Sequence, residues 1–324
     1  MIRPSMNQLG RGPRCAAVAM SAALAAAAAA DHKASMTGWE EELQRGRKET
    51  LESFRDPQSS PYAAVARADF AGAQPLILGS AADCDVRLEG AAPRHARIHV
   101  EGDWFVLDAI DAGATFQVLA AGHGGTAPPS APAPAAVRSA RVQGGARIGL
   151  SGYTLRLSHQ NFPGLLVLDP RSPRLGSGPP PRWFPPDPAL RVTARLARDA
   201  NPREEVVLST RGNKRRALRV GAFDLSLGGQ AVRLTALRLL EPGVGEAELS
   251  IFFRDATTGR ESYPVGRYLE PDPVSGRPDE YVLDFNRAYN PTCAFSPLYN
   301  CPIPPRENVL AVPVRAGELD PGGH

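Results

Sequence analysis

Residues 191–196 of this 324-residue chain are Arg-Val-Thr-Ala-Arg-Leu, and residues 232–237 are Val-Arg-Leu-Thr-Ala-Leu. Apolar and polar side chains alternate with a period of two in both stretches, so each stretch would have one apolar and one polar face as a strand. Further strand-like stretches lie at residues 205–208, 223–227 and 249–253. This pattern is typical of half-buried antiparallel strands. We therefore predict a mainly antiparallel β domain over residues 189–317.

Short strand-like stretches also occur in the preceding part of the chain. Between residues 75 and 118 they recur every 8 to 12 residues and are separated by Gly, Pro and Asp, a spacing that favours a β-sandwich. Residues 122–136 are a Gly-, Ala- and Pro-rich stretch with nothing to bury. Because the strand pattern resumes at residues 147–157, we predict one sandwich over residues 62–170 that carries 122–136 as a disordered insertion.

One helix is expected at the start of the folded chain. Residues 39–54 carry a partial stripe of apolar side chains at helical spacing, beginning with Trp39 and Leu43. Pro57 ends this pattern, because proline disfavours the helical conformation in the residue before it. We assign the N-terminal helix to residues 37–55, and the predicted fold class is mainly β with this helix at its N-terminal end.

A proline-rich linker is predicted at residues 176–188, between the two β regions. It contains Trp183 and Phe184, two large aromatic side chains that a solvated linker rarely carries. We therefore expect both side chains to dock on a neighbouring surface.

The N-terminal segment bears on localisation. An alanine-rich run follows three arginines and ends before Asp31, a pattern that favours a signal peptide over residues 1–30 and an exported, periplasmic or secreted protein. The alternative is an upstream extension with the true start at Met36, which would indicate a cytoplasmic protein. The remainder of the chain has no apolar run of the length and character of a transmembrane span.

Composition excludes several kinds of site. The net charge is only +3, so no nucleic-acid partner is expected. None of the six histidines lies between Gln160 and Gly323. The C-terminal half therefore cannot by itself supply a Ser-His-Asp triad or a histidine-ligated zinc site. No metal and no cofactor are expected.

Three stretches in the first half resemble the core of a forkhead-associated domain. They are Leu-Gly-Ser at residues 78–80, Asp-Cys-Asp-Val-Arg-Leu at 83–88 and Arg-His-Ala-Arg-Ile at 94–98. That family binds phosphothreonine through an Arg after the first Gly, a Ser shortly before the His and a later Asn-Gly. Here Ser80, Ala92 and Ala112 stand at the donor positions, whereas Gly79 and His95 match the scaffold. The resemblance implies the fold, and it implies that phosphothreonine peptides are not ligands.

A second resemblance is carried by longer motifs. Residues 252–263 are Phe-Phe-Arg-Asp-Ala-Thr-Thr-Gly-Arg-Glu-Ser-Tyr and residues 283–291 are Leu-Asp-Phe-Asn-Arg-Ala-Tyr-Asn-Pro. Matching motifs continue at residues 265–269, 293–295, 301–302 and 304–308. They are similar to the bacterial domain of unknown function numbered 1684, over about residues 39–317. The resemblance implies a shared fold and assigns no activity.

Polar side chains are unusually dense in this C-terminal segment. The candidate ligand-binding residues are Arg254, Asp255, Glu261, Tyr263, Arg267, Asp284, Asn286, Arg287, Tyr289 and Asn290. Planar guanidinium groups bind carboxylates and phosphates bidentately, so we predict a non-catalytic binding protein for a small anionic ligand or a protein partner.

Two alternatives stay open for the same residues. They would form a closed ion network that fastens loops, or the chain would be a metal-independent hydrolase with Asp284 or Glu261 as the base. Cys293 and Cys301 lie eight residues apart. They would form a disulfide in an oxidising compartment or remain two buried thiols.

Overall fold

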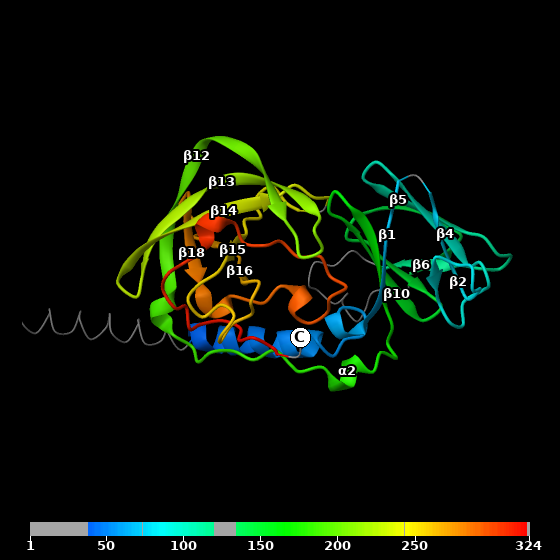
Figure 1. Cartoon of the computed structure of the whole chain (residues 1–324), viewed down its shortest axis with the longest axis horizontal. Coiled ribbons are helices and arrows are strands. Elements are labelled where there is room, and N and C mark those ends of the chain that lie inside the picture. Colours follow the sequence, from blue (N-terminus) through cyan, green and yellow to red (C-terminus); the bar gives the residue numbers. More distant parts are fainter. Residues whose placement is uncertain (1–37, 73, 120–133, 243, 323–324) are drawn as a thin grey trace, which may run out of the picture. The chain divides into compact units, whose positions relative to one another are not determined.

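The computed structural model describes residues 38–72, 74–119, 134–242 and 244–322 (Figure 1). Two compact units make up the chain, residues 1–47 and residues 48–324. The predicted signal peptide lies outside the described residues, as does most of the predicted insertion at 122–136. Export and the proposed domain boundaries therefore stay predictions.

The fold is mainly β, as predicted. The predicted N-terminal helix is also present and covers residues 38–53. Its end before Pro57 agrees with the restriction that proline places on the preceding residue.

Two sheets form the first half of the larger unit. One sheet has the strand order β1-β11-β10-β9-β6-β7 and the other has the order β3-β2-β4-β5-β8. The strands are β1 (Ala64–Asp69), β2 (Leu76–Gly79), β3 (Val86–Arg87), β4 (Ala96–Glu101), β5 (Trp104–Ala109), β6 (Phe116–Leu119), β7 (Ala136–Val137), β8 (Ser139–Gln143), β9 (Arg147–Leu150), β10 (Tyr153–His159) and β11 (Pro163–Leu168). Both sheets contribute side chains to one core, among them Ile98 and Phe105 from one sheet and Ile148 and Leu155 from the other.

A curved five-stranded sheet dominates the C-terminal half, with the order β14-β13-β12-β18-β17 (Figure 1). Its strands are β12 (Arg191–Leu208), β13 (Lys214–Leu227), β14 (Gln230–Leu239), β17 (Asp272–Pro273) and β18 (Glu280–Asp284). A second, two-stranded sheet pairs β15 (Ile251–Phe253) with β16 (Arg267–Leu269). Phe223, Phe253 and Phe285 are fully buried in the core that these strands share.

The sequence predicted two separate strands where the structure has one. Residues 191–196 and 205–208 are the two ends of β12, and the pairing register with β13 shifts between Arg198 and Arg203. The intervening residues 199–202 are Asp-Ala-Asn-Pro, all exposed except for the half-buried Asp199, and none has a large apolar side chain that would mark them as strand in the sequence.

Short helices lie before and between the strands of the larger unit. They are η1 (Pro61–Ala63), α2 (Arg174–Ser177), η2 (Pro188–Leu190), η3 (Phe285–Arg287), η4 (Thr292–Ala294) and η5 (Arg306–Asn308). The expected docking is confirmed for Phe184: its side chain is buried, and its N–H donates to the carbonyl of Gly317. Trp183 forms an isolated β-bridge with Glu318.

A third core cluster joins the two halves of the larger unit. Tyr62 and Leu168, from the first half, belong to the same buried cluster as Phe252, Tyr268 and Phe295. The rings of Tyr62 and Phe295 meet edge to face, with their centroids 6.1 Å apart. The two halves of the larger unit therefore share one buried apolar cluster.

Candidate functional site

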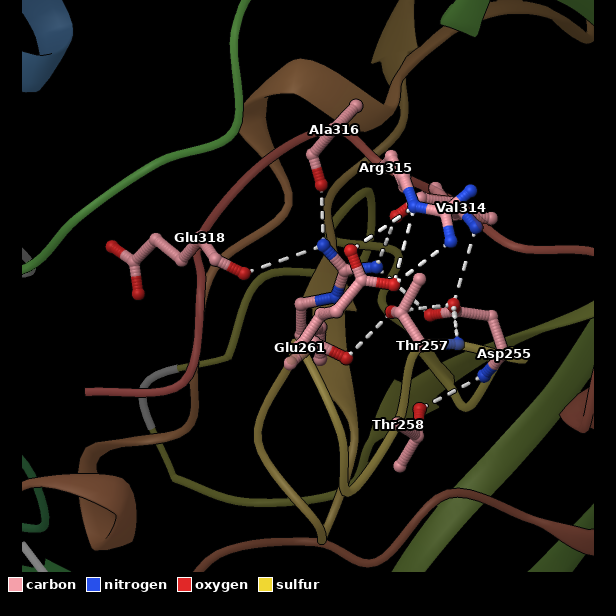
Figure 2. Close-up of polar contacts among 10 residues, drawn as sticks. Asp255, Thr257, Thr258, Glu261, Val314, Arg315, Ala316 and Glu318 are labelled. Carbon is pink, nitrogen blue, oxygen red and sulfur yellow. Dashed lines mark hydrogen bonds and ion pairs between the residues drawn. The ribbon is translucent and has the colours of Figure 1, made fainter. Parts of the chain in front are cut away.

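Arg267 is the largest fully buried side chain among the described residues. Figure 2 shows the polar contacts around its partner Asp255, including those with Thr257 and Val314. Arg267 begins β16, where pairing with Phe253 of β15 turns its side chain toward the C-terminal segment. Its guanidinium donates to Asp255 Oδ2 at 2.8 Å and to the carbonyl of Val314 at 2.7 Å. It also donates to the carbonyls of Ala316 and Glu318. Burial lowers the pKa of this guanidinium, and the facing Asp255 carboxylate opposes the shift.

The other oxygen of Asp255 is also fully engaged. Oδ1 accepts from Thr257 N at 2.8 Å, from Thr257 Oγ1 at 2.6 Å and from Val314 N at 3.1 Å. Thr257 and Ser262 share a further hydroxyl hydrogen bond of 2.8 Å. The turn ends at Gly259, whose positive φ of 77° suits glycine. Arg267 and Asp255 thus belong to a closed network, fastened to residues 314–318.

Arg254 lies close to this network in sequence but has its own partner. Its Nε donates to the carbonyl of Val265 at 2.9 Å. The guanidinium therefore secures the turn that leads into β16, and its partners differ from those of Arg267.

Asp284 is the centre of a second, separate group of charged side chains. Antiparallel pairing of β12 with β18 places Arg191 opposite Asp284. The turn of η3 brings Arg287 back toward the same carboxylate, three residues further on. Asp284 Oδ2 lies 3.8 Å from Arg191 Nε and 3.6 Å from Arg287 Nε. The side chain of Asp284 is 3% exposed, whereas those of Arg191 and Arg287 are 44% and 38% exposed.

Asn286 holds Asp284, the buried carboxylate of this second group, in place. Its amide oxygen accepts from the N–H of Asp187 at 2.7 Å, and its Nδ2 donates back to the carbonyl of Asp187 at 2.8 Å. The backbone N–H and the amide of Asn286 also donate to Asp284 Oδ1, at 3.1 and 2.9 Å. These contacts use the linker before η2 to hold Asp284 in one orientation.

The remaining predicted residues are distributed over four other contacts. Glu261 forms a fork-to-fork contact with Arg315, and the hydroxyl of Tyr289 donates to Glu270 Oε1 at 2.9 Å. The N–H of Asn290 donates to Glu318 Oε2 at 2.8 Å. The hydroxyl of Tyr263 lies 3.9 Å from Cys293 Sγ. The structure therefore separates the ten predicted residues into several small groups.

Burial shifts the pKa of tyrosines in this segment. It raises the pKa of Tyr263 and Tyr268, both of which lie near the thiols of Cys293 and Cys301. Their phenols are therefore protonated and able to donate hydrogen bonds near neutral pH. The two cysteines left open by the sequence are present as free thiols.

Sequence reasoning missed Arg191 and Glu318 as partners of the predicted residues. Arg191 is the first residue of an alternating strand, so its sequence gave no sign of a role beyond strand polarity. Its position opposite Asp284 follows from a strand pairing across 93 residues, which alternation cannot predict.

The described residues were also searched for a metal site and for a membrane-spanning helix. Within these residues, no group of three or more His, Cys, Asp or Glu is arranged to hold a metal ion. None of the helices in the same ranges has both the length and the apolar character needed to cross a lipid bilayer.

The fold and these contacts define a mainly β protein built around a buried arginine–carboxylate network. A family model described as protein of unknown function (DUF1684) matches residues 181–319. The solution NMR structure of an uncharacterized protein of Haloarcula marismortui is 37% identical, covers 47% of this chain and 82% of that chain, and has a TM-score of 0.38. A search of curated proteins found no match. The family match supports the second resemblance over residues 181–319, as a domain of unknown function.

Proposed function

We propose that this protein is a non-catalytic binding protein that holds a small anionic ligand between the guanidinium groups of Arg191 and Arg287. One observation carries the proposal: two half-exposed guanidinium groups flank a single buried carboxylate, that of Asp284. Both arginine side chains stay partly exposed, whereas the carboxylate that they share is buried. Guanidinium forks bind carboxylate and phosphate groups bidentately.

The fixed orientation of Asp284 supports ligand binding at this position. Asn286 holds Asp284 through two donors and is itself held by the backbone of Asp187. A carboxylate fixed in this way orients both arginines before a ligand arrives. Binding then costs less ordering of side chains, which is the benefit of preorganisation.

The contacts of the two candidate bases favour binding over the alternative, a hydrolase. A general base must lie within hydrogen-bond reach of the proton that it removes. Asp284 is buried beneath the two arginines and already accepts from Asn286. Glu261 faces Arg315 with both of its oxygens. Asp284 is therefore shielded from solvent, and both oxygens of Glu261 already accept from a guanidinium.

The N-terminal sandwich supports a second, structural proposal, a forkhead-associated-like fold without its phosphate donors. Gly79 packs so closely against the carbonyl of Pro93 that a Cβ atom there would collide with it. His95 is buried and fastens two loops, since its Nδ1 accepts from Ala92 N at 3.2 Å and its Nε2 lies 2.8 Å from the carbonyl oxygen of Thr115. Arg94 is bound to Asp83 at 2.6 Å, so this arginine is engaged by a carboxylate at that end of the sandwich.

Inorganic phosphate and citrate should raise the melting temperature of the protein. Binding to the folded state alone stabilises it by about 2.7 kcal/mol when the ligand concentration is 100 times Kd. The increase should be lost in Arg287→Ala and in Arg191→Ala, because each variant removes one side of the anion site. Thermal unfolding at constant ionic strength, adjusted with sodium chloride, measures the effect.

Arg233→Ala is the matched control for this titration. Arg233 is an exposed arginine paired with Asp224 on the β13–β14 hairpin, and its replacement should leave the phosphate-dependent increase intact. The binding proposal fails if chloride alone raises the melting temperature as much as phosphate does. It also fails if Arg287→Ala keeps the full increase.

A further inference from the structure

Two buried cysteines, Cys293 and Cys301, belong to the third core cluster. Cys293 is in η4, and the loop of residues 294–300 returns the chain to Cys301. The N–H of Cys293 donates to Cys301 Sγ at 3.3 Å. Both cysteines are free, and neither residue is more than 9% exposed.

We propose that Cys293 and Cys301 form a reversible dithiol–disulfide pair whose oxidant is hydrogen peroxide. The proposal rests on the hydrogen bond from the Cys293 N–H to the Cys301 sulfur and on the burial of both residues. It is independent of the anion site, since neither cysteine contacts Arg191 or Arg287 in any of the hydrogen bonds described above. A small oxidant suits the site because so little of each residue is exposed.

The surroundings of the pair give the two cysteines different roles. The Cys301 thiol, the Tyr263 hydroxyl and the Thr210 hydroxyl lower the pKa of the Cys293 thiol to about 7. The contact with Cys293 and burial raise the pKa of the Cys301 thiol. Since the thiolate is the reactive form of cysteine, Cys293 is the nucleophile and Cys301 is the resolving thiol.

The chemistry proceeds in two balanced steps. In the first, the Cys293 thiolate attacks one oxygen of hydrogen peroxide and the O–O bond breaks; the leaving hydroxide takes a proton to become water, and Cys293 becomes a sulfenic acid. In the second, Cys301 loses its proton and attacks the Cys293 sulfur, and the sulfenic oxygen leaves as a second water. The two thiols together lose two electrons and two protons, and peroxide is reduced to two waters.

The position of Cys301 connects this chemistry to the β12–β13 hairpin. The N–H of Cys301 donates to Thr210 Oγ1 at 3.1 Å, and the N–H of Thr210 donates to the carbonyl of Cys301 at 2.9 Å. A disulfide would close the loop of residues 293–301 while this loop remains attached to the hairpin. The oxidised protein should therefore melt at a higher temperature than the reduced protein, because closing a loop lowers the entropy of the unfolded chain.

The test uses the full chain with Cys15→Ser and Cys84→Ser, so that only the proposed pair can react. The folded protein is treated with hydrogen peroxide, unfolded, alkylated and weighed by mass spectrometry. We expect the mass to fall by two hydrogens, both thiols to resist alkylation, and dithiothreitol to restore them. The rate should rise as the pH increases through about 7, because the Cys293 thiolate then becomes more abundant.

Two single variants distinguish the roles of the cysteines. Cys301→Ser should leave a sulfenic acid at Cys293 that dimedone traps, whereas Cys293→Ser should leave Cys301 unreactive. The proposal is overturned if the parent pair keeps both thiols under peroxide, or if the bridge forms only between two chains on a non-reducing gel. Trapping of Cys301 in place of Cys293 would overturn the assignment of the nucleophile. The parent experiment stands even where a serine variant fails to fold.

Discussion

Arg267→Ala should lower the free energy of unfolding by about 3 to 5 kcal/mol, the range typical of removing one partner of a buried ion pair. The reason is that Asp255 would keep its charge in the core without a counterion. The carbonyls of Val314, Ala316 and Glu318 would lose their donors at the same time. Equilibrium unfolding in urea, followed by circular dichroism, measures the loss.

Two other variants serve as comparisons for Arg267→Ala. Arg233→Ala removes an exposed guanidinium and should change the free energy of unfolding by less than about 1 kcal/mol. The double variant Arg267→Met with Asp255→Asn removes both charges, so it should be more stable than Arg267→Ala. A closed network is contradicted if Arg267→Ala costs no more than Arg233→Ala.

Asn308→Ala should also destabilise the protein strongly, by at least about 3 kcal/mol, since each unsatisfied buried polar group costs roughly 1 to 3 kcal/mol. Asn308 is fully buried in η5 and crosslinks two strands. Its Oδ1 accepts from Thr235 N at 2.8 Å, and its Nδ2 donates to the carbonyls of Thr235 and Phe252 at 3.0 and 2.9 Å. Alanine would leave all three backbone groups without these partners. Urea unfolding again provides the measurement.

Asn201→Ala is the matched control for this prediction, because Asn201 is exposed in the bulged part of β12. It should change the free energy of unfolding by less than about 0.5 kcal/mol, as surface substitutions usually do. An Asn308→Ala variant as stable as Asn201→Ala would mean that water satisfies the three backbone groups and that the crosslink adds nothing.

Local periodicity explains how much of the fold the sequence predicted. The alternating stretches at 223–227 and 232–237 lie in β13 and β14, because a strand with one buried face must alternate. The stripe of residues 39–54 likewise indicated the helix. The middle of β12 was not recognised as strand: it has no large apolar side chains, so the sequence suggested two strands in place of one.

The candidate site depended on contacts that periodicity does not contain. The density of polar residues correctly drew attention to the segment, but Arg267 and Arg287 look alike in sequence and differ completely in burial. Arg267 is enclosed because residues 314–318, about 50 positions later, present their carbonyls to it. Arg287 stays half-exposed because a short helix turns it outward beside Asp284. Neither outcome follows from the neighbouring residues alone.

The central claim is that this polar segment contains a closed arginine network at Arg267 and an open anion site at Arg191 and Arg287. Labelling of the folded protein with phenylglyoxal, mapped by peptide mass spectrometry, tests both halves in one measurement. The account predicts that Arg191 and Arg287 react in the folded protein, that Arg267 reacts only after unfolding, and that inorganic phosphate slows labelling of Arg191 and Arg287 but not of Arg233. Labelling of Arg267 at the rate of Arg287, or phosphate protection that is no greater at Arg191 and Arg287 than at Arg233, would contradict it.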